Sequence, residues 1–353
     1  MTDRMNAEHA VTANRKGEHI RICLQEQVQG TGAGPGFDGY RFRHLALPEI
    51  AFHDIDLAVS FLGRRLSAPL LISSMTGGTE ETALINARLA EAAETRGWAM
   101  GLGSMRAAIE NEHLASTFQM RRFAPSIPII ANLGAVQLNY GYGIDQCRRA
   151  VEMAEADALV LHLNSIQEVF QPEGNTDFRG LLRRIGEVCR LMDVPVGIKE
   201  VGWGIDAETA GVLLEAGVAF IDVAGAGGTS WSQVEKHRAR DELRADAAAA
   251  FADWGTPTAA CVRDIRAERP EATVIASGGL ANGVDAAKAI ALGADLAAYG
   301  RTLLAGAADP AAGASGPLQR RMERIEFELR AAMFGIGAAN IGQLRATDRL
   351  LQV

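Results

Sequence analysis

Eight short apolar runs, each ending at a polar, charged or glycine residue, constrain the fold of this chain more than any other feature. They cover residues 69–74, 98–104, 127–132, 159–162, 194–199, 220–222, 273–279 and 296–301. Continuous apolar runs are typical of strands that are buried on both faces of a parallel sheet. Because most neighbouring runs are separated by one segment of helical length, the sequence predicts an α/β fold: a closed (β/α)8 TIM barrel with an N-terminal extension.

Helical signals occur between these runs. The expected helices cover approximately residues 80–96, 112–122, 145–156, 177–192, 206–216, 257–268 and 284–292. In one of them, Asp206 can cap the N-terminus and Gly217 follows the last turn. A short helix is also expected from Asn14 to Leu24, a loop over 305–316 and an amphipathic helix over 318–333.

These patterns predict that the chain has three parts. Residues 1–65 are expected to form an N-terminal extension that contributes substrate-binding residues, with a short β-ribbon over 54–62 that closes the bottom of the barrel. Residues 66–340 form the barrel, and residues 341–353 form a C-terminal tail. The connection after the sixth strand is the longest, so an excursion at the barrel mouth is expected over 231–254.

Composition argues against several classes of protein. The 353 residues carry a formal charge of −8, whereas a general nucleic-acid binder needs a basic surface. The four cysteines, Cys23, Cys147, Cys189 and Cys261, form no C-x-x-C pair, which argues against a zinc site and favours a reducing cytosol. The polar N-terminus and the lack of a run of about 18 apolar residues predict a cytoplasmic protein without a membrane span.

Glycine-bearing loops follow the last three strands, at residues 225–229, 277–280 and 299–301. Glycine allows backbone N–H groups to approach an anion closely. In TIM barrels, the loops after strands seven and eight commonly bind a phosphate. Three such loops together predict a phosphate site, although ordinary turn glycines explain any one of them. They do not distinguish a phosphorylated substrate from flavin mononucleotide (FMN).

A lysine, Lys199, ends the fifth strand. Its ammonium group is costly to desolvate unless an anion or a dipole meets it. Three roles stay open: a partner for the N1–C2=O edge of a reduced flavin, a Schiff-base lysine, or an ion pair with Glu200 or Asp222. Backbone, hydroxyl and amide groups that suit a flavin ring end strands one to three, at residues 74–78, Ser104 and Asn132.

A further set of polar residues suits a diphosphate and a metal ion. Candidate anion-binding residues are Arg15, Lys16, His19, Arg106, His162 and Asn164. A single carboxylate, here Glu168, can hold Mg2+ together with substrate phosphates and waters. The alternatives are a solvated basic dipeptide at Arg15 and Lys16, and a glutamate at Glu168 that simply suits the start of a helix.

Taken together, these residues resemble the type 2 isopentenyl-diphosphate isomerases. The matching segments follow the family's order between about residues 12 and 340, at 15–20, 75–78, 103–106, 131–134, 162–168, 199–202, 222–231 and 277–279. The resemblance implies an enzyme of isoprenoid precursor biosynthesis that interconverts isopentenyl and dimethylallyl diphosphate by proton addition and elimination. It implies reduced FMN, Mg2+ and NAD(P)H as the reductant, and a homo-oligomer of four or eight chains.

The resemblance also implies a role for each matching residue. Substrate would contact Arg15, Lys16, His19, Ser104, Met105, Arg106, Asn164 and Gln167. FMN would contact Ser74, Met75, Thr76, Gly77, Ser104, Asn132, Lys199, Ala224, Thr229, Gly278, Gly279, Leu280, Tyr299 and Gly300. Glu168 would bind the metal, and the candidate catalytic residues are Gln167, His162 and Trp231. Trp231 would offer a π-face to a cationic intermediate, or would simply pack in its loop. Ser165 stands where family members often have proline.

Two other functions compete with this interpretation. An FMN-dependent α-hydroxy-acid oxidase or dehydrogenase needs a histidine base after the strand-five lysine. The one histidine after Lys199 is His237, in a charged stretch (234–238) that is expected to be exposed. A non-catalytic flavin-binding barrel would not need Arg15, Arg106, Gln167 and Glu168 together.

Overall fold

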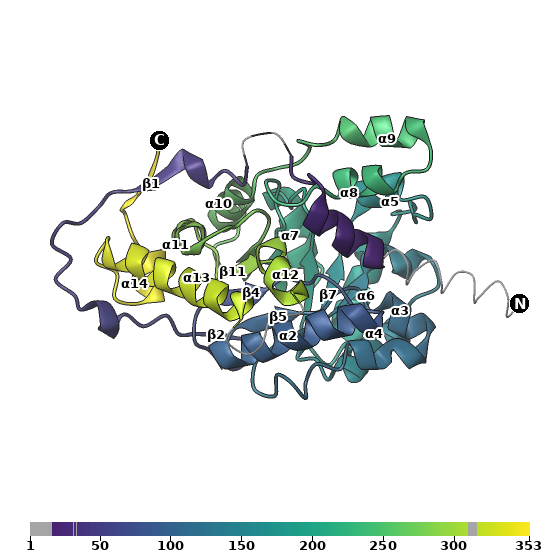
Figure 1. The fold of residues 1–353 in the computed structure, drawn as a ribbon, viewed down its shortest axis with the longest axis horizontal. Coiled ribbons are helices and arrows are strands. Elements are labelled where there is room, and N and C mark those ends of the chain that lie inside the picture. The colour runs from purple at the N-terminus through teal and green to yellow at the C-terminus, as the bar shows by residue number, and fades with distance from the viewer. Residues whose placement is uncertain (1–15, 31, 33, 310–315) are drawn as a thin grey trace, which may run out of the picture.

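Eight parallel strands close into a barrel, which confirms the predicted fold (Figure 1). The computed structural model describes residues 16–30, 32, 34–309 and 316–353. The barrel strands are β4 (Leu70–Ile72), β5 (Ala99–Gly101), β6 (Ile129–Gly134), β7 (Ala158–His162), β8 (Val196–Lys199), β9 (Phe220–Asp222), β10 (Val274–Ala276) and β11 (Leu296–Tyr299). Each strand overlaps one apolar run. The ring closes where Ala297 of β11 pairs with Leu70 of β4.

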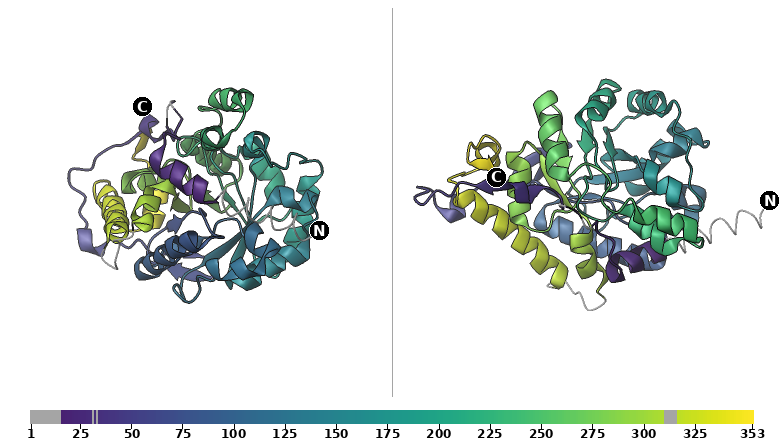
Figure 2. Two further views of the ribbon diagram at one scale, coloured as in Figure 1. Left: turned by 45° about the vertical axis from the view of Figure 1, so that its right-hand side comes forward. Right: turned by 90° about the horizontal axis from the view of Figure 1, so that it is seen from above.

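Helices cover the outside of the barrel, as the two further views show (Figure 2). The main ones are α2 (Glu80–Arg96), α4 (Ile144–Ala154), α6 (Leu181–Leu191), α7 (Ala207–Glu215), α10 (Thr258–Glu268), α11 (Gly283–Ala291), α12 (Arg301–Ala308) and α13 (Pro317–Phe334). Side-chain caps fix several starts, including Asp206 on the backbone N–H of Thr209. Two expectations were wrong in detail. The helix expected over 112–122 is limited to the short 3-10 helix η3 (Glu112–Thr117), which follows α3 (Arg106–Glu110), and α12 extends into the expected loop.

The bottom of the barrel is closed by a hairpin of β2 (Val59–Phe61) and β3 (Arg64–Leu66). The expected ribbon over 54–62 therefore contains only the first of its two strands. Phe61 packs edge-on against Phe220 inside the barrel, with ring centroids 5.7 Å apart. Gly197 on β8 makes room for that ring, because an added Cβ would lie 2.1 Å from Phe220 Cε2. The barrel interior is thus a packed core up to its C-terminal end.

Segments from both chain ends complete the molecule. Strand β1 (Tyr40–Phe42) pairs antiparallel with β12 (Leu350–Gln352). In the sequence, β1 lies between the short 3-10 helices η1 (Phe37–Gly39) and η2 (Phe52–Asp54), and β12 follows α14 (Ile341–Arg345). Residues 16–25 form the N-terminal helix, which lies near α8 (Trp231–Arg238), α9 (Glu242–Ala249) and α5 (Ser165–Phe170) (Figure 1). Helices α8 and α9 form the expected excursion.

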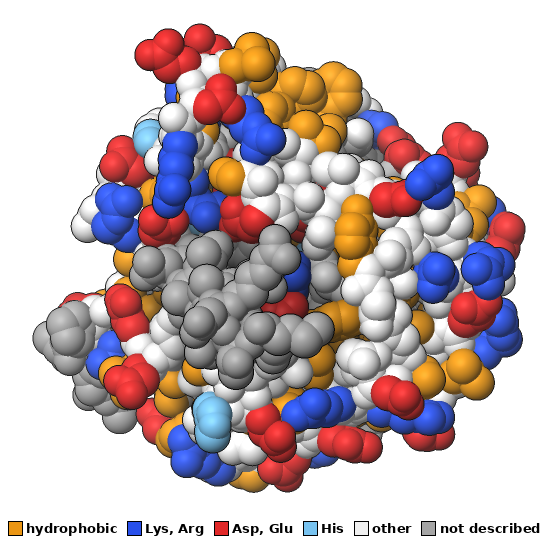
Figure 3. All heavy atoms as spheres, turned by 90° about the vertical axis from the view of Figure 1, so that its right-hand side faces the viewer, with side chains coloured by type: hydrophobic (Ala, Val, Ile, Leu, Met, Phe, Trp, Pro, Cys, Tyr) orange, Lys and Arg blue, Asp and Glu red, His pale blue; other side chains and the backbone are white. Residues whose placement is uncertain are grey.

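Surface charge is mixed on the face drawn in Figure 3, where basic and acidic side chains are interspersed. Within the described ranges, no helix combines the length and apolarity that crossing a bilayer requires.

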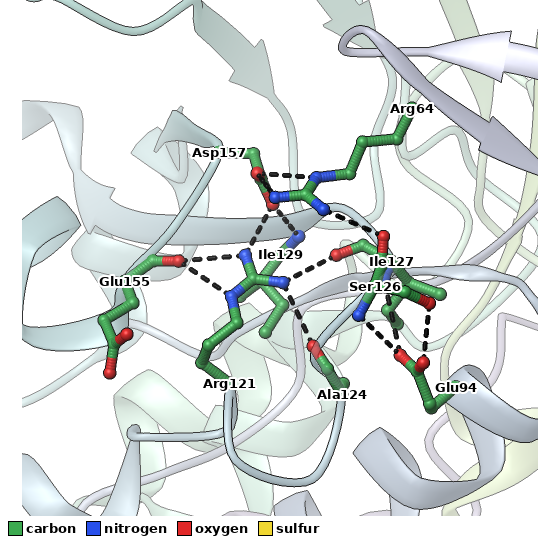
Figure 4. Close-up of polar contacts among 9 residues, drawn as sticks. All are labelled: Arg64, Glu94, Arg121, Ala124, Ser126, Ile127, Ile129, Glu155 and Asp157. Carbon is green, nitrogen blue, oxygen red and sulfur yellow. Dashed lines mark hydrogen bonds and ion pairs between the residues drawn. The ribbon is translucent and has the colours of Figure 1, made fainter.

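An ionic cluster ties the N-terminal ends of β6 and β7 to the hairpin (Figure 4). The Asp157 carboxylate accepts hydrogen bonds from Arg64 Nε at 2.8 Å, from Arg121 Nη2 at 2.6 Å and from the Ile129 backbone N–H at 2.9 Å. Burial alone would raise the pKa of Asp157, but these three donors outweigh burial and lower it below its ordinary value. The cluster therefore depends on an ionised aspartate.

Asp157→Asn is expected to lower the free energy of unfolding by about 2 kcal/mol at pH 7, because charge-assisted hydrogen bonds are lost. A depressed folded-state pKa gives stability that is complete above the unfolded value, about 4, and is lost as the pH falls through the folded value. Urea unfolding should therefore show a smaller difference between wild type and variant at pH 3. The control is Asp193→Asn, at an exposed position. An equal difference at both pH values would contradict this account.

Candidate active site

A cavity of about 530 Å³ opens at the C-terminal ends of the barrel strands. Loops after all eight strands contribute to its wall, and Ile20, Cys23 and Leu24 of the N-terminal helix cover it. Active sites of TIM-barrel enzymes lie at this end of the fold. The N-terminal extension therefore closes the site of its own chain.

Most of the residues that the sequence singles out line this cavity. They are Lys16, His19, Ser74, Met75, Thr76, Ser104, Arg106, Asn132, His162, Asn164, Gln167, Glu168, Lys199, Ala224, Thr229, Trp231, Gly278, Gly279, Leu280 and Gly300. Met105 and Tyr299 lie in the hydrophobic core instead. Gly77 packs against the ring of Phe118, which an added Cβ would approach to 2.1 Å. Arg15 lies outside the described residues.

Lys199 is buried at the end of β8, where its Nζ donates to the backbone carbonyl of Glu200 at 2.5 Å. Burial lowers the pKa of Lys199, and the charges of Asp222 and Glu200 oppose that shift. Among the described residues, Lys199 forms no salt bridge. The geometry thus does not favour a purely structural ion pair, and it leaves the ammonium available to an anionic ligand.

Two buried carboxylates accompany this lysine. Glu200 Oε2 accepts hydrogen bonds from the backbone N–H groups of the next three residues, at 2.7, 2.7 and 2.6 Å. Burial nevertheless raises the pKa of Glu200 to about 7. Burial also raises the pKa of Asp222, against the effects of Lys199 and of the Ser277 hydroxyl, which donates at 2.5 Å. The lysine charge therefore stabilises both carboxylates.

The three glycine loops meet at one side of the cavity, and the first two pack closely against each other. An added Cβ at Gly228 would lie 2.6 Å from the backbone nitrogen of Gly279, and Gly278 has a φ of +102°. Thr258 fixes the second loop by donating to the carbonyls of Ser277 and Gly278, at 3.0 and 2.6 Å. Helix α12 starts directly after Gly300 without a side-chain cap. Uncapped helix N-termini and close-packed glycine backbone suit a phosphate.

Three polar atoms in the cavity wall are buried without a hydrogen-bond partner in the described part of the chain: Ser73 Oγ, Thr76 Oγ1 and Asn164 Oδ1. Buried polar groups in native proteins almost always have partners, so a bound ligand is the natural partner here. Asn132 is held in place by its own contacts with the Leu102 carbonyl, at 3.0 Å, and with His162 Nδ1, at 2.8 Å. The wall thus fits a heterocycle with a phosphate tail, as in FMN.

A hydrogen-bonded cluster occupies the opposite side of the cavity, at α5. Asn164 Nδ2 donates to Glu168 Oε1 at 2.8 Å and to Gln167 Oε1 at 3.2 Å. Glu168 Oε2 accepts from the backbone N–H of Asn175 at 2.5 Å. Lys16 Nζ reaches the Ser104 carbonyl at 3.2 Å. No group of three or more acidic, histidine or cysteine side chains suited to a metal occurs within the described residues, so a metal here would depend on Glu168 and on ligand oxygens.

Glu235 is a site residue that the sequence interpretation missed. The stretch 234–238 was expected to be exposed, and for Glu235 this was wrong: its side chain is fully buried. Its Oε1 accepts from His19 Nε2 at 3.1 Å and from Gln167 Nε2 at 3.0 Å. Burial would raise the pKa of Glu235, but His19, Arg238 and Gln167 outweigh burial and hold it at about 2. Glu235 itself lies behind the cavity wall, and the lining residues that were not foreseen include Cys23 and Gln137.

Comparison with known proteins assigns the family. An FMN-dependent dehydrogenase family model matches residues 147–351. An isopentenyl-diphosphate delta-isomerase from Oceanobacillus iheyensis is 52% identical and covers 95% of each chain. One from Nostoc sp. is 50% identical over 98% of this chain and 97% of its own. The chain belongs to the FMN-dependent, type 2 isopentenyl-diphosphate delta-isomerase family.

Solved structures show that this isomerase family shares its fold with flavin oxidoreductases. An (S)-mandelate dehydrogenase is 19% identical, with a TM-score of 0.67 over 99% of each chain. A lactate oxidase from Pediococcus acidilactici is 18% identical, with a TM-score of 0.64 over 90% of this chain and 84% of its own. These likenesses concern the fold alone. His237, the histidine that the oxidase alternative would need, is exposed and does not line the isomerase-family cavity.

Proposed function

We propose that this chain interconverts isopentenyl diphosphate and dimethylallyl diphosphate by adding a proton to one carbon and removing one from another. The observation that carries the proposal is one cavity with two different halves: glycine loops beside Lys199, and a polar cluster of Lys16, Arg106, Gln167 and Glu168. The first half fits FMN, and the second fits a diphosphate with a metal ion. The names of the relatives, at about 50% identity, support isopentenyl diphosphate as the substrate.

The residues that would hold FMN surround the first half. The glycine loops and the start of α12 would bind its phosphate, and Lys199, Asn132 and Thr76 would contact the ring. When bound in its reduced state, FMN supplies an electron-rich ring and a nitrogen, N5, that can hold a proton. We propose that NAD(P)H provides the reducing electrons, since isomerisation itself consumes none.

The second half would bind the diphosphate. Burial works against the charge of Arg106, but the hydrogen bond from its Nε to Glu110, at 2.6 Å, and the charge of Glu110 outweigh burial and raise its pKa. Arg106 therefore stays cationic beside Lys16. Glu168 would bind Mg2+, because a carboxylate oxygen combined with phosphate oxygens and waters matches the preference of that ion. The unpartnered Asn164 Oδ1 adds a second oxygen near the same side.

The remaining residues would control protons and water. The Gln167 side chain donates from its amide NH2 to Glu235 and accepts at its carbonyl oxygen from Asn164, so both polar groups of its amide are fixed. His162 is fixed by Asn132. Trp231 packs edge-on against His19 at 5.0 Å and lines the cavity, where its π-face can stabilise a developing carbocation. The apolar residues of the N-terminal helix keep water away from that cation.

Anaerobic incubation with isopentenyl diphosphate, FMN, Mg2+ and NADPH tests the proposal. We expect dimethylallyl diphosphate to accumulate to equilibrium, while NADPH consumption stops once the flavin is reduced. A chain that is inactive with reduced FMN, but whose oxidised flavin is bleached by lactate-like 2-hydroxy acids, would instead be an oxidase or dehydrogenase.

A further inference from the structure

A buried arginine outside the cavity lining joins three elements around the site. Arg238, at the end of α8, has a side chain that is only 8% exposed. Its Nε pairs with Glu18 of the N-terminal helix at 3.1 Å, and its Nη2 pairs with Glu173, just after α5, at 3.3 Å. Its Nη1 donates to Glu235 Oε2, one turn earlier on α8, at 2.5 Å. One guanidinium thus uses its fork of donors on three carboxylates.

The chemistry of Glu235 makes the third contact important. An ionised carboxylate can only accept hydrogen bonds. As long as Glu235 is ionised, Gln167 must turn its NH2 toward Glu235, and His19 must carry a proton on Nε2. The carbonyl of Gln167 then faces Asn164. The ionised form of one buried carboxylate therefore requires this orientation of the Gln167 amide and a proton on this ring nitrogen at the cavity wall.

Burial raises the pKa of Glu235, and His19, together with Arg238 and Gln167, outweighs burial and keeps the carboxylate ionised. The groups that face Glu235 are His19 and the thiol of Cys23 from the N-terminal helix, Gln167 from α5 and Arg238 from α8. Of these, Arg238 alone is charged at every physiological pH. Without Arg238, Glu235 Oε2 would be buried with no hydrogen-bond donor, which favours protonation of the carboxyl group on that oxygen. A Glu235 protonated on Oε2 would still accept through Oε1, but a neutral carboxyl accepts more weakly than a carboxylate, so its hold on the Gln167 NH2 would loosen.

We propose that Arg238 is a positioning residue for the isomerisation: it fixes the Gln167 amide through Glu235 and holds the N-terminal helix over the cavity through Glu18. The expected changes in kcat and KM rest on the proposed function, whereas the expected changes in the hold on the N-terminal helix do not. The Arg238 side chain has two separate roles, one for each of these contacts. The contact with Glu235 governs turnover, and the contact with Glu18 governs how firmly Lys16 and His19 are held at the substrate.

The experiment compares Arg238→Gln, Arg238→Lys and Glu18→Gln with Arg240→Gln, an exposed arginine two residues further on that serves as control. For Arg238→Gln we expect kcat to fall at least tenfold at pH 6 and to recover in part toward pH 9, where Glu235 ionises again. Arg238→Lys keeps a cation and should recover most of kcat. Glu18→Gln should raise KM at least threefold with little change in kcat. The control should match wild type.

Amide hydrogen exchange of the N-terminal helix, followed on the same variants without substrate, separates this inference from the proposed function. Exchange should accelerate at least tenfold in Arg238→Gln and Glu18→Gln, but not in Arg240→Gln, even if wild type proves to have another activity. An Arg238→Gln variant with the wild-type pH profile and wild-type exchange would overturn the inference. If that variant does not fold, unchanged KM and exchange in Glu18→Gln would overturn it equally.

Discussion

Glu168→Gln is expected to reduce kcat about a hundredfold and to raise the Mg2+ concentration needed for half-maximal activity, while FMN affinity stays unchanged. The wild-type carboxylate accepts one donor on each oxygen, from Asn164 Nδ2 and the Asn175 backbone N–H. A carboxamide has one oxygen acceptor and no charge. It therefore loses its attraction for a cation and also leaves one neighbouring donor without a partner.

The measurement is a titration of isomerase activity with Mg2+ at saturating FMN, together with flavin fluorescence as a separate measure of cofactor binding. Glu208→Gln, an exposed position on α7, makes the same chemical change away from the cavity and should behave as wild type. If Glu168→Gln kept the wild-type magnesium dependence, the metal would have to bind elsewhere. If the variant also lost FMN binding, Glu168 would be needed for the structure of the whole cavity and not only for the metal.

The barrel could be predicted because its signal is local. Each strand overlaps a continuous apolar run, and every run except 220–222 ends at a residue that lines the cavity. Element boundaries were less predictable where a side chain redirects the backbone. Asn111 is extended, with a φ of −140°, and caps η3 through His113. The helix expected over 112–122 is limited to η3, after which the Arg121 side chain bonds the carbonyls of Ala124 and Ile127.

The site was predictable to the extent that its residues follow strands. Glu235 and Arg238 do not, since they come from the excursion after β9. Their signal is helical spacing: Trp231, Val234, Glu235 and Arg238 recur at i, i+3, i+4 and i+7, which is one face of a helix. Charge hid this pattern, because glutamate and arginine are rarely buried unless they are paired. The partners, His19 and Glu18, lie more than 200 residues away in sequence.

Lys199→Met is expected to weaken FMN binding at least about tenfold and to make the midpoint potential of the bound flavin more negative by about 30–60 mV. Methionine preserves most of the buried aliphatic volume, so the change acts mainly through charge. With the ammonium removed, Glu200 and Asp222 would face the ligand without a compensating cation. Because reduction adds negative charge to the flavin, the substitution should weaken binding of the reduced form more than binding of the oxidised form.

Fluorescence quenching gives the affinity, and anaerobic reductive titration against a reference dye gives the potential. Lys236→Met, at an exposed position on α8, is the matched control. The sign of the shift discriminates between the roles of Lys199. A flavin-facing ammonium predicts weaker binding and a lower potential together, whereas a lysine that only neutralises Glu200 and Asp222 predicts a loss of stability at an unchanged potential.

Trapping by borohydride in the presence of a carbonyl substrate would instead identify a Schiff-base lysine, and wild type is expected to resist it.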